Sequence, residues 1–272
     1  MNSIDRYVVI GNPIEHSKSP QIHAMFAAQT GQSMQYERLA APLDGFAGAV
    51  AALIDSGARG ANVTVPFKLD AHALATTLSD RAQAAGAVNT LLFDDAHISG
   101  DNTDGIGLVT DIICNAQIDL RGKRLLLLGA GGAARGVLLP LLQQQPSALV
   151  IANRSVDKAI VLAQQFAAYG TVTATPFDQV DGAFDIVINA TAASLADALP
   201  PISASVFAPG SLAYDMMYAA TPTIFLRFAA QHGAFTRDGL GMLVEQAAEA
   251  FFLWRDVRPQ TELVLKRLRA AL

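Results

Sequence analysis

The sequence predicts an α/β protein made of two units, the second of which contains a doubly wound parallel sheet. Short apolar segments alternate with longer amphipathic segments along the chain, and this alternation is typical of mostly parallel sheets covered by helices. A glycine-rich loop stands directly between a strand segment and a helical segment near the middle of the chain. The last two helical segments are followed by no strand, so we expect them to pack back on the first unit.

The composition is that of a folded chain with a substantial core. Its 272 residues allow two domains of ordinary size, and 51% hydrophobic against 16% charged residues argues against disorder. A net charge of −5 gives no reason to expect nucleic acid or an anionic membrane as a partner. No apolar stretch approaches the ~18 to 20 residues that span a bilayer, and the apolar run at 7–10 is too short for a signal peptide. We therefore expect a cytoplasmic protein.

Cys114 is the only cysteine, which excludes an internal disulfide and a thiolate metal site. It falls on the apolar side of a helical stretch, beside Ile112, Ile113 and Ala116, and this position predicts a small buried hydrophobe. No spaced cluster of histidine, cysteine and carboxylate side chains indicates a metal site.

Within the first hundred residues, apolar periodicity predicts strands that alternate with helices. The expected strands are 7–10, 34–39, 61–65 and 88–93. The expected helices are 20–29, 44–54 and 69–78. Pro20 follows Ser19 at the first helix, where serine can cap the N-terminus and proline fits the first turn.

The second unit begins with an expected strand at 124–128, which leads through the glycine loop into a helix at 134–144. Further strands are expected at 149–152, 172–174, 185–189 and 211–215. A helix at 105–116 links the two series, and the last helices are 242–255 and 262–272. We expect a discontinuous first domain of residues 1–104 and 240–272 and a second domain of residues 105–239.

The run from Gly129 to Ala134 has the G-x-G-x-x-A form of a Rossmann-type dinucleotide loop. In this pattern the first glycine allows a tight turn, and the second lets the backbone approach a pyrophosphate. The helix N-terminus that follows attracts the anion. A plain tight turn would contain the same glycines, but the strand before the loop and the strand after the helix favour a cofactor site. The expected cofactor residues here are Gly129, Ala130, Gly131, Gly132, Ala133 and Ala134.

The residues after the second strand of this unit favour NADP over NAD. An NAD site usually has a carboxylate there, roughly 20 residues after the loop, to bind the ribose hydroxyls. This chain instead has Asn153, Arg154 and Ser155, followed by Lys158. A guanidinium and an ammonium suit a 2′-phosphate, and no carboxylate stands between the end of this strand and Asp157. The alternative interpretation is a solvated helix start with ordinary charges.

Lys68 is the first candidate for a catalytic residue, with Asp104 as its proposed partner. A lysine at the end of a short apolar strand can donate or accept a proton when its position is controlled, and a carboxylate can hold the ammonium in place. Strand alternation would place Lys68 and Thr64 on one side and turn Val63 and Val65 into the core. Because Pro66 ends the strand, we expect Lys68 at a helix start. The alternative is an ordinary surface lysine.

Ser17 and Ser19 offer two hydroxyls at an expected helix N-terminus, and this arrangement predicts a binding site for a carboxylate. Simple capping of the helix by Ser19 is the alternative. His16 and His23 flank these serines, and we expect them to be hydrogen-bonded structural groups rather than bases. Trp254 is interpreted as a packing residue.

The chain resembles the shikimate dehydrogenase family along nearly its whole length. In the first half the matching motifs are Gly11-Asn-Pro-Ile-Glu-His-Ser-Lys-Ser-Pro20, Ala61-Asn-Val-Thr-Val-Pro-Phe-Lys68, Gly86-Ala-Val-Asn-Thr90 and Gly100-Asp-Asn-Thr-Asp-Gly105. In the second half they are residues 129–135, Asn153-Arg154-Ser155, Tyr214-Asp-Met-Met-Tyr218 and Gly239-Leu-Gly-Met-Leu-Val-Glu-Gln246. The order and spacing of these motifs together make the resemblance specific.

The resemblance implies an NADP-dependent reduction of 3-dehydroshikimate to shikimate, a step toward chorismate and the aromatic amino acids. It implies that Lys68 is the general acid and base, paired with Asp104. The implied substrate residues are Ser17 and Ser19 for the carboxylate, Thr64, Asn89, Asp104 and Gln246 for the ring hydroxyls, and Tyr218 nearby. The implied cofactor residues are the glycine loop, Asn153, Arg154, Ser155 and Lys158 around the 2′-phosphate, Thr191, and Met216 and Gly239 near the nicotinamide.

One segment departs from the family pattern. After Asn189-Ala-Thr191, the family usually has a serine or proline and soon a glycine, whereas this chain continues with Ala192, Ala193 and Ser194. We expect changed hydrogen bonding in this loop, with weaker NADP binding as a consequence.

Two rival functions stay open at this point. A quinate/shikimate dehydrogenase of the same superfamily would oxidise quinate and often use NAD, and the Arg154/Lys158 pair disfavours it. A non-catalytic dinucleotide sensor would have no evident need for the Lys68/Asp104 pair. The expected partner is a small-molecule substrate, and a homodimer is compatible with the sequence.

Overall fold

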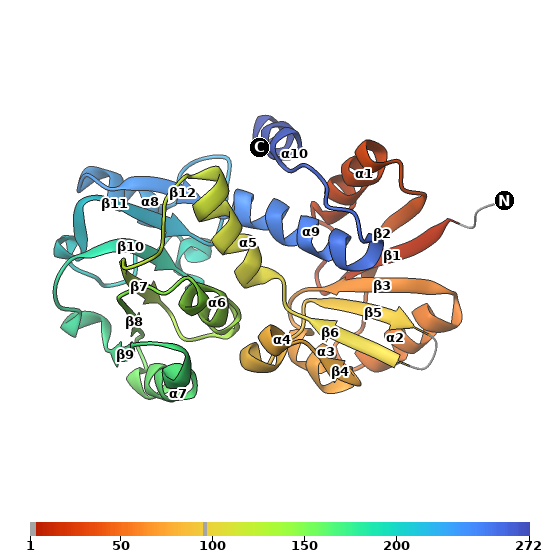
Figure 1. Cartoon of the computed structure of the whole chain (residues 1–272), viewed down its shortest axis with the longest axis horizontal. Coiled ribbons are helices and arrows are strands. Elements are labelled where there is room, and N and C mark those ends of the chain that lie inside the picture. Colours follow the sequence, from red (N-terminus) through yellow and green to blue (C-terminus); the bar gives the residue numbers. More distant parts are fainter. Residues whose placement is uncertain (1–3, 95–96) are drawn as a thin grey trace. The chain divides into compact units, whose positions relative to one another are not determined.

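A computed structural model describes residues 4–94 and 97–272, which form two compact units (Figure 1). The first unit comprises Met1–Gly107 and Val244–Leu268, and the second comprises Leu108–Leu243 and Arg269–Leu272. The chain passes from the first unit to the second within helix α5 (Asp104–Thr110). It returns within helix α9 (Leu240–Arg255). In the described part of the chain, no helix is both long and apolar enough to cross a membrane.

The first unit contains a mixed sheet with the strand order β2-β1-β3-β5-β6-β4. Its strands are β1 (Asp5–Gly11), β2 (Met34–Ala40), β3 (Ala58–Val63), β4 (Thr77–Leu78), β5 (Thr90–Asp94) and β6 (His97–Asp101). Strand β1 is parallel to β2 and β3, whereas β5 is antiparallel to β3 and β6. The sheet is therefore less parallel than expected, because only residues 95 and 96 separate β5 from β6 and so short a connection joins antiparallel strands.

The helices of the first unit are α1 (Ser19–Thr30), α2 (Phe46–Asp55), α3 (Lys68–Leu74), α4 (Asp80–Ala85), the second part of α9, and α10 (Glu262–Ala270) up to Leu268. The helix expected at 69–78 ends at Leu74, because Thr77 and Leu78 pair with β6. The sequence analysis missed β4, α4 and β6.

The strand that leads to Lys68 is shorter than expected. Strand β3 ends at Val63, which is buried, and alternation does not continue beyond it. Val65 is therefore 67% exposed, and the prediction that it faces the core was wrong. The prediction that Lys68 lies at a helix start is confirmed, since it is the first residue of α3.

The second unit contains a parallel sheet with the order β12-β11-β10-β7-β8-β9. Its strands are β7 (Arg124–Leu128), β8 (Ala148–Ala152), β9 (Val172–Thr175), β10 (Phe184–Asn189), β11 (Phe207–Asp215) and β12 (Phe235–Asp238). Read from β9, this is the doubly wound order 3-2-1-4-5-6, and it confirms the predicted fold class. The order reverses between β7 and β10, where ligands bind in such sheets.

The helices of the second unit are α6 (Gly132–Gln143), α7 (Val156–Phe166), α8 (Ile224–Gln231) and the first turn of α9, with short 3₁₀ segments Ala167–Tyr169, Phe177–Gln179, Ala193–Ala196 and Ala204–Val206. The central strand β7 is buried on both faces, since its four leucines have no exposed surface. Strand β12 was not expected, because its short sequence Phe-Thr-Arg-Asp has no apolar alternation.

The linking helix changes type along its length. Helix α5 ends at Thr110 and continues as a π-helix, η1 (Asp111–Asn115). The wider turn of a π-helix shifts the following side chains relative to an α-helical stripe. Ile112 is fully buried as expected, but Cys114 is exposed, and the prediction that it is buried was wrong.

His23 lies fully buried among aromatic rings in the first unit. Its ring stacks on Tyr36 at a centroid distance of 4.1 Å and meets Phe26 edge-on at 6.0 Å. Neither ring nitrogen has a well-formed hydrogen bond among the described residues, so the expectation of a hydrogen-bonded histidine was wrong. Burial lowers the pKa of His23 to about 3, and the nearby Asn62 side chain opposes only part of this shift.

Because His23 is buried in its neutral form, we predict that the free energy of unfolding falls in mild acid. The pKa of an unfolded histidine is about 6.5, so between pH 6.5 and 3 the unfolded chain binds more protons than the folded chain. The contribution of neutral His23 to the free energy of unfolding is fully present above pH 6.5 and is lost as the pH falls toward 3. Relative to His23→Gln, the wild-type free energy of unfolding should fall by about 2 to 3 kcal/mol between about pH 7 and pH 4.5.

Urea unfolding at both pH values checks this prediction through the fluorescence of Trp254. This is the only tryptophan, and its ring lies 5.4 Å from that of His23, so it reports on the first unit. The exposed His97 provides the control, because His97→Gln should retain the wild-type pH dependence. Equal pH dependence in wild type and His23→Gln would contradict the prediction.

Candidate active site

Lys68 and Asp104 form an ion pair in the first unit. The Lys68 Nζ donates to the Asp104 Oδ2 at 2.6 Å. Lys68 begins α3 and Asp104 begins α5 directly after β6, so two element starts that are 36 residues apart in sequence meet here. The lysine side chain is 30% exposed while the aspartate side chain is 8% exposed. The ammonium is therefore held by a nearly buried carboxylate but keeps access to solvent.

Asn89 donates a hydrogen bond to the second carboxylate oxygen of Asp104. Its Nδ2 donates to the Asp104 Oδ1 at 2.8 Å and lies 3.1 Å from the Gln246 Oε1. Asn89 and Asp104 are both buried. A buried carboxylate is costly unless both oxygens are hydrogen-bonded, and Asn89 and Lys68 together satisfy it. The structure thus brings together Lys68, Asp104, Asn89 and Gln246.

Two threonines that the sequence analysis missed fix the orientation of the Asn89 amide. The Asn89 Oδ1 accepts from the Thr103 backbone N–H at 2.9 Å and from the Thr90 hydroxyl at 2.9 Å. A backbone N–H can only donate, so the oxygen of the amide must face it and the Nδ2 must face Asp104. Both threonines stand inside recognised motifs, but nothing in a linear pattern shows which atom each one contacts.

Ser17, Ser19 and Thr64 are half-buried in the same unit. Helix α1 begins at Ser19, with Lys18 at the N-cap, so capping by Ser19 is not what the structure has. Instead, the Ser17 Oγ accepts from the Ser19 backbone N–H at 3.3 Å. The Arg38 guanidinium donates to the Ser17 carbonyl at 2.6 and 3.1 Å and holds this turn in place.

The glycine loop of the second unit lies at the switch point of the parallel sheet. Gly129 follows β7 with a φ of +107°, and a Cβ there would lie 3.2 Å from the Thr191 Cγ2. Gly131 is the N-cap of α6, and no side chain of the described residues caps this helix. A Cβ added at Gly131 or Gly132 would meet no described atom within 4 Å, which leaves room for a ligand. Free backbone N–H groups in an open loop fit a dinucleotide pyrophosphate.

The residues expected around a 2′-phosphate lie at the end of β8 and the start of α7. The Asn153 Nδ2 donates to the Ser155 carbonyl at 2.8 Å and shapes this turn. Arg154 and Lys158 are exposed, and neither is paired with a carboxylate in the part of the chain that the structure describes. Two uncompensated cations here fit a phosphate better than a pair of ribose hydroxyls.

Met216 and Gly239 contact each other at the carboxyl ends of β11 and β12. A Cβ on Gly239 would lie 2.1 Å from the Met216 carbonyl oxygen, so only glycine fits. The Met216 N–H donates to the Asn189 carbonyl at 3.0 Å, which ties this turn to β10. Tyr218 is half-buried two residues further on, and burial together with the Asp238 charge raises the pKa of its hydroxyl.

The loop that departs from the family pattern is anchored by Ser194. Its hydroxyl donates to the Asp215 Oδ2 at 2.6 Å and accepts from the Asn189 Nδ2 at 3.2 Å. The Asn189 Oδ1 accepts from both the backbone N–H and the hydroxyl of Thr191. Ser194 thus ties the loop to β10 and β11 although Ala192 carries no hydroxyl, and the weaker NADP binding that we expected stays a prediction.

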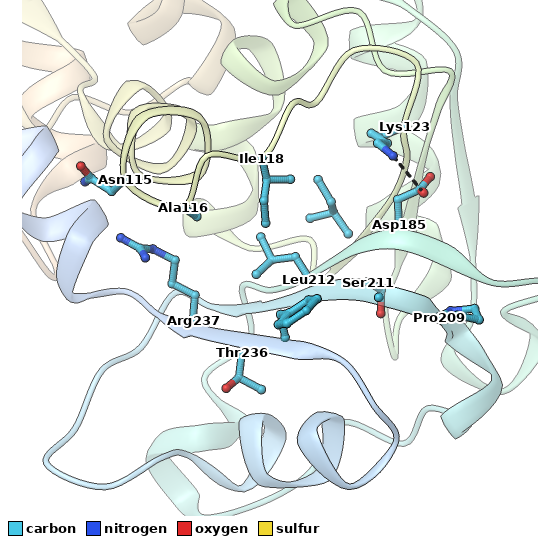
Figure 2. Close-up of a pocket in the computed structure, with 13 residues that line it drawn as sticks. Asn115, Ala116, Ile118, Lys123, Asp185, Pro209, Ser211, Leu212, Thr236 and Arg237 are labelled. Carbon is cyan, nitrogen blue, oxygen red and sulfur yellow. Dashed lines mark ion pairs between the residues drawn. The ribbon is translucent and has the colours of Figure 1, made fainter.

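Figure 2 shows a cavity of about 570 Å³ in the second unit that contains none of the expected site residues. Ile118 and Leu212 lie in its middle, and charged side chains lie at its ends. The Lys123 Nζ lies 3.5 Å from the Asp185 Oδ1, and Arg237 is bound by both oxygens of the buried Asp111 at 2.6 Å. Because these charges are already paired, the cavity offers no uncompensated charge to a ligand.

Three family models match successive parts of the chain. They describe the shikimate dehydrogenase substrate binding domain at residues 9–91, shikimate / quinate 5-dehydrogenase at residues 112–196, and the shikimate 5′-dehydrogenase C-terminal domain at residues 239–269. The order of these matches follows the chain from the first unit into the second and back toward the first.

Relatives and solved structures agree with these matches. The shikimate dehydrogenase (NADP(+)) of Herminiimonas arsenicoxydans is 65% identical over 98% of this chain and 98% of its own length. The enzyme of the same description from Janthinobacterium sp. (strain Marseille) is 63% identical over 97% of both chains. The structure of shikimate 5-dehydrogenase from Thermus thermophilus, in complex with NADP(H) and shikimate, is 33% identical with a TM-score of 0.89 and covers 98% of this chain and 100% of its own.

The contact between Gly239 and Met216 generates a prediction. In Gly239→Ala, the added methyl group meets the Met216 carbonyl, and this turn must shift. We expect the free energy of unfolding to fall by about 1 to 3 kcal/mol, as for other overpacked positions, and dinucleotide binding to weaken. Chemical unfolding and dinucleotide titration measure the two effects. Gly48→Ala in α2 is the control, because no described atom lies near its added methyl, and equal behaviour of the two variants would refute the argument.

Proposed function

The chain belongs to the shikimate dehydrogenase family, and we propose that Lys68 and Asp104 are its catalytic pair. Its reaction is the reversible NADP-dependent reduction of 3-dehydroshikimate to shikimate, an oxidoreduction at a ring ketone. The observation that carries the catalytic assignment is the 2.6 Å ion pair between a part-exposed lysine and a nearly buried aspartate.

Lys68 is the general acid and base in this proposal. When bound, NADPH supplies the hydride that reduces the ketone carbon. The Lys68 ammonium donates a proton to the oxygen that becomes an alkoxide, and its charge stabilises that oxygen before the proton moves. In the reverse direction, neutral Lys68 accepts the proton of the hydroxyl that is oxidised.

Asp104 holds Lys68 and orients it. Its Oδ2 accepts from Lys68, while its Oδ1 is already bound by Asn89, so the carboxylate cannot rotate away without losing a buried hydrogen bond. A lysine side chain has four rotatable bonds, and a fixed partner reduces the number of positions that its ammonium can adopt.

The substrate and cofactor assignments are those that the family resemblance implies. Ser17 and Ser19 would hold the substrate carboxylate, and Thr64, Asn89, Asp104 and Gln246 would hold the ring hydroxyls. Tyr218 is also assigned to the substrate. Residues 129–134 would hold the pyrophosphate of NADP, with Asn153, Arg154, Ser155 and Lys158 at the 2′-phosphate and Thr191, Met216 and Gly239 toward the nicotinamide. On this basis residues 1–104 and 240–272 form the substrate domain, and residues 105–239 form the NADP domain.

A cytoplasmic location is a further prediction from the sequence, and a homodimer is compatible with it.

Initial rates on the purified protein test the proposed function. Dinucleotide reduction is followed by the absorbance of the reduced nicotinamide, with shikimate or quinate as substrate and NADP or NAD as cofactor. A clear preference for shikimate with NADP is expected. Turnover mainly of quinate or with NAD would assign the enzyme to the quinate-oxidising branch, and dinucleotide binding without any turnover would favour the sensor.

Lys68→Ala should lose most of the turnover. Because general acid catalysis typically contributes ~10²- to 10⁴-fold, kcat is expected to fall by about that factor while the KM for shikimate changes little. Steady-state kinetics measures both constants. Lys266→Ala is the control, since this lysine is exposed on α10 and, among the residues that the structure describes, pairs only with Glu262. A Lys68→Ala variant with near-normal kcat would remove Lys68 from the mechanism.

Arg154 and Lys158 should determine the choice of cofactor. In a variant with both residues replaced by alanine, the KM for NADP should rise by about tenfold or more, because each charge-assisted phosphate contact contributes about 1 kcal/mol or more. The KM for NAD should stay near its wild-type value, since NAD has no 2′-phosphate. Arg267→Ala is the control for loss of an exposed arginine. An equal rise in KM for both cofactors would show that Arg154 and Lys158 do not recognise the 2′-phosphate.

A further inference from the structure

We propose that Tyr36, which lies outside the expected site, is a positioning residue for the catalytic pair. It begins a chain of hydrogen bonds that all donate in the same direction and end on Asp104. The inference rests on the proposed function, because it assigns a task to Tyr36 in the reaction of Lys68 and Asp104.

The first link runs from β2 to β3. The Tyr36 hydroxyl donates to the Asn62 Oδ1 at 2.7 Å. Burial raises the pKa of Tyr36 well above its usual value, and a hydrogen bond with the Ser19 side chain opposes part of this rise. The hydroxyl therefore stays protonated near neutral pH and remains a donor.

The second link fixes the direction of the Asn62 amide. Its Nδ2 donates to the Asn89 backbone carbonyl at 3.2 Å and to the Thr90 Oγ1 at 3.1 Å. A carbonyl oxygen can only accept, so the nitrogen of the amide must face it. The amide oxygen is thereby left for Tyr36, and reversing the amide would break both ends at once.

The third link passes from Thr90 to the catalytic pair. Because the Thr90 hydroxyl accepts from Asn62, its own proton is free to donate to the Asn89 Oδ1 at 2.9 Å. With its oxygen occupied, Asn89 presents its Nδ2 to the Asp104 Oδ1 at 2.8 Å. The Asp104 Oδ2 is then left to Lys68.

The chain connects strand β2 to the proposed proton donor. It begins at the Tyr36 hydroxyl and ends on Asp104, which holds Lys68. Hydrogen bonds that donate in series polarise one another, so each link strengthens the next. Removing the first donor should loosen Asn62 and Thr90 and weaken the Thr90 bond to the Asn89 oxygen, which then rests mainly on the Thr103 N–H.

The competing explanation is that Tyr36 only packs, since its ring stacks on His23 and lies 6.2 Å from that of Trp254. Tyr36→Phe separates the two explanations, because it keeps the ring and removes the hydroxyl. Tyr7→Phe is a matched control. Tyr7 is the register partner of Tyr36 on β1 and also stacks on Trp254, at 4.6 Å, but its hydroxyl accepts from Arg255 at 3.4 Å instead of joining the amide chain.

The expected result is a split between turnover and binding. In Tyr36→Phe, kcat should fall about five- to tenfold, which corresponds to the contribution of one typical hydrogen bond passed along the chain, while the KM values stay within about twofold of wild type. Tyr7→Phe should keep wild-type kcat, and the two variants should unfold at similar temperatures. Wild-type kcat in Tyr36→Phe, or an equal loss in Tyr7→Phe, would overturn the proposal.

A double variant tests whether the effect passes along the chain. Thr90→Val removes the third donor without changing the side-chain shape, and it should also lower kcat. If Tyr36 acts through Thr90, then adding Tyr36→Phe to Thr90→Val should cause no further loss, because the chain is already interrupted. If the two losses of kcat instead multiply, the two residues act independently, and the proposed chain of hydrogen bonds from Tyr36 to Asp104 is refuted. The comparison uses the substrate and cofactor pair that the wild type turns over, so a failure of the shikimate assignment is seen in the wild type and a failure of the relay is seen only in the variants.

Discussion

The nearly buried carboxylate of Asp104 imposes the constraint on which the first unit's site depends. A charge with so little exposure requires partners for both of its oxygens, and the protein supplies one amide donor and one ammonium. The amide donor, Asn89, must in turn face the right way, and it does so because a backbone N–H and a hydroxyl occupy its oxygen. The position of Lys68, which we propose as the general acid and base, therefore follows from the need to pair a buried charge.

The second unit differs, since it leaves backbone donors without partners at the loop where we propose that the dinucleotide binds. The parallel sheet brings the glycine loop of β7 beside the end of β10 at the point where the strand order reverses. Helix α6 begins there without a side-chain cap among the described residues, so its first N–H groups remain available to an anion. In the adjoining loop, by contrast, the Ser194 hydroxyl forms hydrogen bonds with Asp215 and Asn189 and so stabilises the loop.

Much of the fold could be predicted because long apolar periods are local signals. The strands at β1, β2, β7, β8 and β10 and the helices α1, α6 and α9 lie within a few residues of their expected ranges. The strands that the sequence analysis did not predict share a cause. Strand β4 has two residues and β12 has four, so neither contains a period to recognise, and both exist only because a neighbouring strand pairs with them. The π-helical turn that exposes Cys114 is equally invisible to a search for α-helical periodicity.

The sequence by itself determined the class of fold and the family, and it supplied the candidate site residues, because motifs and periodicity are properties of neighbouring residues. Only the tertiary structure decided which atoms meet. That Ser17 rather than Ser19 accepts at the start of α1, that Thr103 and Thr90 share the oxygen of Asn89, and that a chain of donors reaches this amide from Tyr36 could not be read from any motif. The direction of a hydrogen bond depends on distances between residues that are far apart in the chain, and a linear pattern contains no information about those distances.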